Sequence, residues 1–426
     1  MCPCCGRSRA YIGEQTAEQL DLELARFFVL RTIKTSYACR HCDPTKVPVE
    51  PRIATAGPAQ VGPIPTGLCG SGLLAHVVTA KHADHVPIHR LAGQLARSRV
   101  QIASSTLGDW LKQASELLTP LYQLMHTRLL LSRVIHGDDT PVKLRVPGSQ
   151  RMKKAHLWTC IGTADYPYVV FDFPTNHTAE GPTRFLKGYE GYFQADAWAQ
   201  YERLYAEGRM THVCCVAHAR RKFVAASEAG DQRATPVLEM IVRLYAIERA
   251  LPPLLPRTDD PVQREQRRQC EEQRRQLRQR DAEPVRDELA KWLGEQKPGA
   301  LSKSPLGGAI GHTANNWDAL KRYLDADYLA VDNNLSERTL RAIAPGRNNW
   351  SVIGSEVGGQ TAATLYSIVG TCKHLGIDPF AYLRDALPGL FALCKKPTAE
   401  QLSDWLPDRW LVNRTRDQPI RDVTAG

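Results

Sequence analysis

Three acidic residues stand where their side chains could act together. Asp138 lies in the run from His136 to Pro141, Asp196 follows the apolar run 191–195, and Glu337 comes shortly after Asp332-Asn333-Asn334. Carboxylates gathered at one place are destabilising unless a cation neutralises them, and Mg²⁺ is the hard ion that oxygen ligands satisfy. Two such ions activate an attacking water or 3′-hydroxyl and stabilise the leaving oxygen of a phosphoryl transfer. These acids therefore predict a site for two Mg²⁺ or Mn²⁺ ions.

Each acid also has an ordinary structural interpretation. Asp-Thr-Pro after Asp138 is common in turns, and Asp196 could cap a following helix. Asn334 with Glu337 three residues later has the spacing of a capping box. Singly, these alternatives stay open. The three acids together favour a metal site.

The elements around these acids predict an α/β fold. Residues 134–138, 156–161 and 168–173 have the composition of three consecutive strands. A helix (179–186), a strand (191–195), a helix (198–205), a strand (212–216) and a helix (219–226) are expected to follow. This order predicts a ribonuclease-H-like core, in which an acid on the first strand, one after the fourth and one on a later helix converge at one edge of the sheet.

The cysteines fall into two kinds. Cys2 with Cys5 and Cys39 with Cys42 form two CxxC pairs, which suit a closed tetrahedral Zn²⁺ site. Cys4 with Cys39, Cys42 and His41 is the alternative ligand set, and four unliganded thiols would be the plain interpretation. We expect a group of cysteines in apolar surroundings to be core residues of a cytosolic protein: Cys160, Cys214, Cys215, Cys372 and Cys394.

A proline-rich linker follows the cysteine pairs, and a helical segment precedes the core. Two predicted helices, opening at Pro87 and at Ser104, flank a turn at 98–103. A serine at the second opening and a buried Leu107 and Trp110 suit a helix-turn-helix. Helical pairs of this shape also occur in proteins that never bind DNA.

Basic residues are placed where phosphates would lie beside the acids. One group follows the fifth predicted strand and the other follows Glu337, although Arg341 is also spaced for an i,i+4 ion pair with Glu337. These predicted DNA contacts are His218, Arg220, Arg221, Lys222, Arg338, Arg341 and Arg347. The Arg-rich run 263–280 is better explained as part of a solvated helical insertion, although a DNA-binding arm is the alternative.

The composition agrees with a DNA-associated protein. The 426 residues carry a formal charge of +10, which favours a polyanionic partner. The sequence has no apolar run of the length that a membrane span needs, and its first residues lack the pattern of a signal peptide. We therefore expect no membrane partner and a cytoplasmic location.

In these residues the chain resembles the insertion-sequence-66 family of DDE transposases. The likeness covers nearly the whole chain and is most specific in the run Asn-Asn-x-x-Glu-Arg-x-x-Arg from Asn333 to Arg341. The matching stretches are the cysteine pairs, 73–87, 136–141, 191–201, 215–223, 332–350, 376–383 and 405–413. Three departures are Asp139, where the family usually has Glu, Asn348, where a Lys usually follows Arg347, and Arg99, where the turn usually has Gly.

The resemblance implies a bacterial transposase of a mobile insertion sequence. Asp138, Asp196 and Glu337 would be the catalytic triad and hold two Mg²⁺ or Mn²⁺ ions, while Cys2, Cys5, Cys39 and Cys42 would bind structural Zn²⁺. The enzyme would bind terminal inverted repeats, cut the DNA and join it to a target. It would act as a homodimer or higher oligomer on double-stranded DNA, with or without accessory proteins of the same element.

The expected domains follow from these assignments. They are a zinc-binding module (1–50), a linker (51–70), a helix-turn-helix-like segment (71–131), a ribonuclease-H-like core (132–228 and 305–387), a helical insertion (229–304) and a C-terminal tail (388–426). Family members often have a longer N-terminal region, so one alternative is an inactive or truncated copy that only binds DNA. A ribonuclease-H-like nuclease and a zinc-containing DNA-binding regulator are the others.

Overall fold

The computed structural model describes residues 62–417, with gaps at 65–68, 199–200, 207, 256–257, 259, 342 and 394–395. Of the earlier residues it describes 4, 27–31, 33, 36–38, 45 and 53–55. Among these earlier residues, the short strands β1 (Ser36–Ala38) and β2 (Ile53–Thr55) pair antiparallel. The fold that matters for the site lies beyond residue 62.

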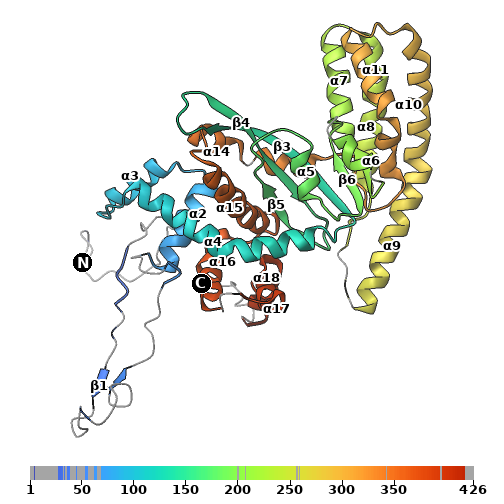
Figure 1. Cartoon of the computed structure of the whole chain (residues 1–426). Coiled ribbons are helices and arrows are strands. Elements are labelled where there is room, and N and C mark those ends of the chain that lie inside the picture. Colours follow the sequence, from blue (N-terminus) through green and yellow to red (C-terminus); the bar gives the residue numbers. More distant parts are fainter. Residues whose placement is uncertain are drawn as a thin grey trace.

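A five-stranded mixed sheet forms the centre of the molecule (Figure 1). Its strands are β3 (Val134–Arg145), β4 (Met152–Ile161), β5 (Val169–Asp172), β6 (Gly191–Ala195) and β7 (Met210–Cys214). The spatial order is β5-β4-β3-β6-β7. The first three strands are antiparallel, while β6 runs parallel to β3 and β7 runs parallel to β6.

The first strand is longer than its apolar start predicted. β3 stays paired with β4 from His136 to Arg145, so Asp138 to Pro141 lie inside the ladder. The interpretation of Asp-Thr-Pro as a turn is therefore wrong. Gly137 is required here, because a Cβ at this residue would lie 2.3 Å from the ring of Phe193 on β6.

Helices cover both faces of the sheet. On the face of Ile135 and Trp158 lies a large core that includes helices α2 (Ser71–His82), α4 (Ser104–Leu129) and α16 (Pro379–Ala392). On the face of Val142 and Leu144 lie α13 (Asn334–Arg341), α14 (Ala344–Trp350) and part of α15 (Glu356–His374). The helices α3 (Ile88–Arg97), α17 (Ala399–Ser403) and α18 (Pro407–Asp417) complete this side of the molecule.

The outer edge of β5 is protected by a helix. The backbone N–H groups of Val169 and Phe171 donate hydrogen bonds to the hydroxyls of Thr371 and Ser367 on α15, at 3.0 and 2.8 Å. Because an exposed edge strand offers unpaired backbone groups to other chains, these hydroxyls close the sheet on this side.

A second body of helices lies beside the β6–β7 end of the sheet (Figure 1). Helix α7 (Val216–Glu228) leaves the last strand and packs with the others around one apolar core. They are α8 (Thr235–Ala250), the π-helical turn η3 (Arg278–Ala282), α10 (Glu283–Gln296), α11 (Pro305–Asn315) and α12 (Trp317–Lys321), with the short 3₁₀ turns η2 (Gln232–Ala234) and η5 (Arg322–Leu324). Helix α9 (Pro261–Leu277) and the 3₁₀ turn η4 (Lys297–Gly299) belong to the same body but contribute no residue to this core in the part of the chain that the structure describes. The predicted helical character of residues 230–300 is therefore confirmed on both sides of 251–255, but these five residues are not helical.

One buried arginine ties this helical body to the chain that returns to the sheet. Arg278 is 1% exposed and makes a two-bonded ion pair with Glu248, at 2.8 and 2.7 Å. Its remaining donors bond the carbonyls of Tyr323, Ala326 and Leu329, each at 2.7 Å. Arg274, which is also buried, donates to the carbonyls of Asp327 and Pro252, so the run of arginines contains two structural side chains among more exposed ones.

The two remaining helices are short. Helix α5 is Glu180–Phe185 and helix α6 is Glu202–Ala206. Within the helix predicted from Trp198, α6 begins at Glu202, and the backbone N–H of Trp198 hydrogen-bonds the carboxylate of Asp196.

Candidate active site

Asp138 lies on β3, and Asp196 directly follows β6, which is parallel to β3. His136 of β3 pairs with Gln194 of β6, and each acid lies two residues beyond this pair. Side chains two residues apart on a strand point to the same face of the sheet. Asp138 therefore faces the same side as His136, which is the side covered by α13.

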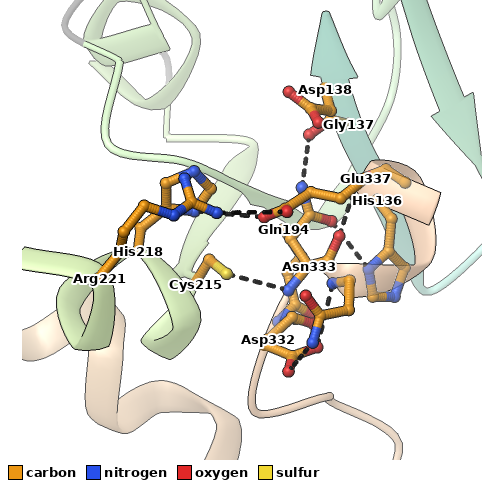
Figure 2. Close-up of polar contacts among 12 residues, drawn as sticks. His136, Gly137, Asp138, Gln194, Cys215, His218, Arg221, Asp332, Asn333 and Glu337 are labelled. Carbon is orange, nitrogen blue, oxygen red and sulfur yellow. Dashed lines mark hydrogen bonds and ion pairs between the residues drawn. The ribbon is translucent and has the colours of Figure 1, made fainter. Parts of the chain in front are cut away.

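Asn333 connects the helix that carries Glu337 to the strand that carries Asp138. Its side chain, which is buried, donates to the carbonyl of Gly137 at 2.8 Å, and its Oδ1 lies 3.2 Å from Nδ1 of His136 (Figure 2). Its backbone carbonyl accepts from the N–H of Glu337 at 3.3 Å and from the hydroxyl of Ser336 at 3.0 Å. The side-chain amide and the backbone carbonyl of Asn333 thus hold α13 against β3.

The loop before Asn333 is fixed to the two other parallel strands. The amide of Gln194 on β6 donates to the carbonyls of Ala330 and Asp332, at 2.6 and 3.1 Å. After β7, the N–H of Val216 donates to the carbonyl of Val331, and Sγ of Cys215 accepts from the N–H of Asn333 at 3.2 Å. The position of Glu337 is thereby set by β3, β6 and β7 together.

Glu337 faces basic side chains at the start of α7 (Figure 2). Its side chain is 13% exposed and lies 3.7 Å from Nδ1 of His218 and 3.5 Å from Arg221. Arg341 lies 3.9 Å away, which is the i,i+4 contact considered as an alternative. The capping box does not form, because the N–H of Asn334 donates to Asp332 instead. Oε1 of Glu337 is buried and has no hydrogen-bond partner among the described residues.

The charges of Asp196 and Glu337 both reach Asp138. Burial raises the pKa of Asp138 to about 7, and the negative charges of Asp196, Asp139 and Glu337 add to this effect, while the N–H of Asp139 opposes it. Burial also raises the pKa of Asp196, against the influence of His218. An ionised Asp138 is therefore costly in the free protein, which is what a cation-binding carboxylate requires.

The oxygens of these acids are not gathered around one point. In the portion of the chain that the structure describes, two groups have three ligand atoms within 4.8 Å of one another: Cys215 with His218 and Glu337, and Asp139 with His156 and His177. The predicted trio is not among them. The structure thus brings Asp138, Asp196 and Glu337 within electrostatic reach, at a wider spacing.

The predicted DNA contacts line the rim of this site unequally. Arg220, Arg221 and Lys222 are exposed on α7, and Arg338 and Arg341 are exposed on α13. Arg347 instead donates to the hydroxyl of Thr140 at 2.6 Å, so it braces β3 directly after the acids.

Comparison with known proteins identifies the family. Residues 66–361 match the model described as "Transposase IS66 family", and residues 1–43 match the "zinc-finger binding domain of transposase IS66". The chain belongs to the IS66 family of transposases. The second match supports Zn²⁺ binding by the N-terminal region of this family member. Cys2, Cys5, Cys39 and Cys42 all lie within it but outside the described residues.

Curated relatives span most of the chain. The uncharacterized protein y4jD of Sinorhizobium fredii (strain NBRC 101917 / NGR234) is 30% identical over 97% of this chain and 78% of its own length. The uncharacterized protein y4hP of the same strain is 28% identical over 96% of this chain and 73% of its own length. No helix in the described portion of this family member has the length and apolar character needed to cross a membrane.

Several residues of the site were not assigned a role from the sequence. Asn333 was noticed only as part of a motif, and Gln194, Cys215 and His136 were given none. Gln194 is a polar residue inside a predicted buried strand. This position was the signal that could have indicated its role, because buried polar groups need hydrogen-bond partners.

Proposed function

We propose that this IS66 family member is a DDE-type transposase with a ribonuclease-H-like catalytic core. Support for the core comes from the strand order β5-β4-β3-β6-β7, with three antiparallel strands followed by two parallel ones. This is the layout in which an acid on the first strand and one after the fourth become neighbours. The order agrees with the arrangement that the sequence predicted.

Asp138, Asp196 and Glu337 are the proposed catalytic acids. The observation that carries this assignment is the raised pKa of Asp138, to which both other acids contribute through their charge. The donor set fits Mg²⁺ or Mn²⁺, because all three side chains offer oxygen and Oε1 of Glu337 is buried without a hydrogen-bond partner among the residues that the structure describes. A pair of bound ions would supply the charge that activates the nucleophile and stabilises the leaving oxygen.

The protein's own residues position this chemistry. Asp138 lies in the β3–β4 ladder, Asp196 directly follows β6, and Asn333 holds α13, which carries Glu337, against β3. Arg221 and His218 contact Glu337 in the free protein. With Glu337 bound to a metal ion, both side chains become available to the phosphates of the DNA.

DNA is the proposed partner of the basic rim and of the helical segment. His218, Arg220, Arg221, Lys222, Arg338 and Arg341 would contact phosphates near the acids, and Arg347 would contribute by holding β3. In the segment 71–131, α3 and α4 are joined by a turn in which Arg99 has φ +62°, a conformation that favours glycine. We propose that these two helices bind the terminal inverted repeats.

The division of the chain follows the sequence prediction. We propose that the zinc-binding module (1–50) holds Zn²⁺ through Cys2, Cys5, Cys39 and Cys42, and that the linker (51–70) joins it to the helical segment. The core would comprise 132–228 and 305–387, with 229–304 as a helical insertion and 388–426 as a tail. A homodimer or higher oligomer would hold two ends of the element during joining, with or without accessory proteins.

A strand-transfer assay with Asp196→Asn tests the proposed function. The substrate is a labelled duplex that carries the terminal inverted repeat, with Mg²⁺ or Mn²⁺ and a plasmid target. We expect the variant to bind the duplex as the wild type does and to lose both cleavage and joining. The control is Asp287→Asn on α10, whose side chain is 70% exposed.

The products separate the alternatives. Joined molecules made by the wild type support a transposase, whereas cleavage without joining would replace it with a nuclease. Unimpaired cleavage by Asp196→Asn would refute the assigned acids.

A further inference from the structure

A second cluster of ligand-type side chains lies on the opposite face of β3. Asp139 follows Asp138 on this strand and therefore points to the other side of the sheet. Its Oδ2 contacts Nδ1 of His156 on β4, and its Oδ1 lies 3.4 Å from Nε2 of His177. The three side chains have ligand atoms within 4.8 Å of one another and share no residue with the proposed catalytic acids.

The cluster is built into the fold. His156 is 2% exposed, and its Nε2 has no hydrogen-bond partner among the described residues. The ring of His177 lies between that of His156, with centroids 3.7 Å apart, and that of Trp198, with centroids 4.1 Å apart. Two imidazoles are thus held beside one carboxylate, and His177 is stacked against the partly buried Trp198.

The charge around Asp139 favours a cation. Within the described ranges of the chain its ion-pair partners are these two imidazoles alone, with no lysine or arginine. The negative charge of Asp139 reaches both Asp138 and Asp196. A divalent ion on Asp139 would relieve this repulsion without occupying the catalytic acids.

We propose that Asp139, His156 and His177 bind one divalent transition-metal ion of the zinc class. Two imidazole nitrogens and one carboxylate oxygen suit such an ion, whereas Mg²⁺ prefers ligands that are all oxygen. This site goes beyond the proposed transposase reaction and does not depend on it.

Only one side chain has to move for binding. The stacked rings lie within 3° of parallel, so their nitrogens point side by side rather than toward one centre. His177 is 33% exposed and can rotate out of the stack, while His156 and Asp139 stay in the sheet. Metal binding should therefore separate His177 from Trp198.

Co²⁺ binding to the full chain tests the proposal. Protein loaded with a single equivalent of Zn²⁺, which the four thiolates of the proposed cysteine site would hold preferentially, is titrated with Co²⁺ in excess Mg²⁺, which occupies the oxygen-only site. We expect one further equivalent of Co²⁺ with visible d–d absorption and no thiolate charge-transfer band. Tryptophan fluorescence should change over the same range of Co²⁺ concentration, because the ring of His177 moves away from Trp198.

Substitutions of two of the three proposed ligands give the decisive comparison. His177→Ala and Asp139→Asn should each weaken this Co²⁺ binding by more than about tenfold, with unchanged circular dichroism and melting temperature. His89→Ala, which removes an exposed imidazole from α3, should leave it unchanged. Co²⁺ binding that is absent, that ignores both substitutions, or that shows a thiolate band would overturn the proposal.

Discussion

The side-chain amide of Asn333 donates a hydrogen bond of 2.8 Å to the carbonyl of Gly137, directly before Asp138 on β3. The carbonyl of Asn333 in turn accepts from the N–H of Glu337. Asn333 thus connects the strand of Asp138 with the helix of Glu337, although these two proposed catalytic acids are far apart in the sequence. His136, which also contacts the side chain of Asn333, is neutral at pH 7, since burial lowers the pKa of its imidazole to about 4.

Replacing this amide should loosen the site more than the fold. Asn333→Ala leaves the carbonyl of Gly137 and Nδ1 of His136 without their partner, which should lower the free energy of unfolding by about 1–3 kcal/mol. Because Glu337 is then less well placed, we expect a higher Mn²⁺ concentration for half-maximal cleavage and unchanged affinity for DNA. Cleavage assays across a Mn²⁺ series and urea denaturation measure both.

The exposed Asn348 offers a matched control for this prediction. Asn348→Ala should match the wild type in stability and Mn²⁺ dependence. If Asn333→Ala needed no more Mn²⁺ than the wild type, Asn333 would have only a structural role.

The sequence predicted the sheet well because local patterns determine it. The strand 191–195 was predicted with its observed bounds, since glycine before it and a polar loop after it end the apolar run. β3 was predicted too short. Its second half alternates exposed and buried residues, and only the pairing with β4 shows that Thr140 and Pro141 remain in the ladder.

The connections within the site could not be predicted in the same way. Asn333 bonds Gly137 and Arg278 bonds Leu329, and both pairs are far apart in the chain. No periodicity or spacing indicates which buried donor meets which carbonyl. The pairing of Asp139 with His177 was missed for the same reason, because His177 lies in a loop without any motif.

Asp138 should make stability depend on pH. Its pKa of about 7 in the folded protein lies above the ordinary 3.8, so between these values the native state holds a proton that the unfolded chain has lost. The free energy of unfolding should therefore fall as the pH rises through this range. The free energy of unfolding of Asp138→Asn should not fall in this way. Because one pKa unit is worth about 1.4 kcal/mol, this variant should be more stable than the wild type at pH 8 by up to about 4 kcal/mol.

Urea denaturation at pH 5 and pH 8, without added Mg²⁺ or Mn²⁺, measures this difference. We expect the advantage of Asp138→Asn to be small at pH 5 and large at pH 8. Asp287→Asn on the exposed face of α10 should show no such change. An advantage of the same size at both pH values would contradict the burial of an ionised Asp138.

Arg221 should contribute a phosphate contact. Its side chain is 61% exposed at the rim of the site and lies 3.5 Å from Glu337. Arg221→Gln should weaken DNA binding regardless of sequence and reduce the slope of log K against log salt by about one. Arg243→Gln on α8, also half exposed and remote from the acids, should keep the wild-type slope. Equal slopes in all three proteins would remove Arg221 from the interface.

Arg278 should be the most important single residue of the helical body for stability. Arg278→Met leaves Glu248 charged and nearly buried, and it removes the donors that hold the carbonyls of Tyr323, Ala326 and Leu329. Breaking a buried pair of this kind costs about 3–5 kcal/mol. Thermal and urea unfolding of the full chain measure the loss.

The nearby Arg280 shows why burial decides this outcome. Its side chain is 71% exposed and its one ion-pair partner among the described residues is the adjacent Asp281, so Arg280→Met should change the stability by less than about 0.5 kcal/mol. Because the segment that Arg278 holds leads directly into the loop before Asn333, Arg278→Met should also weaken Mn²⁺-dependent cleavage at temperatures where it remains folded. A folded Arg278→Met protein with wild-type Mn²⁺ dependence would show that β6 and β7 fix that loop without help from the insertion.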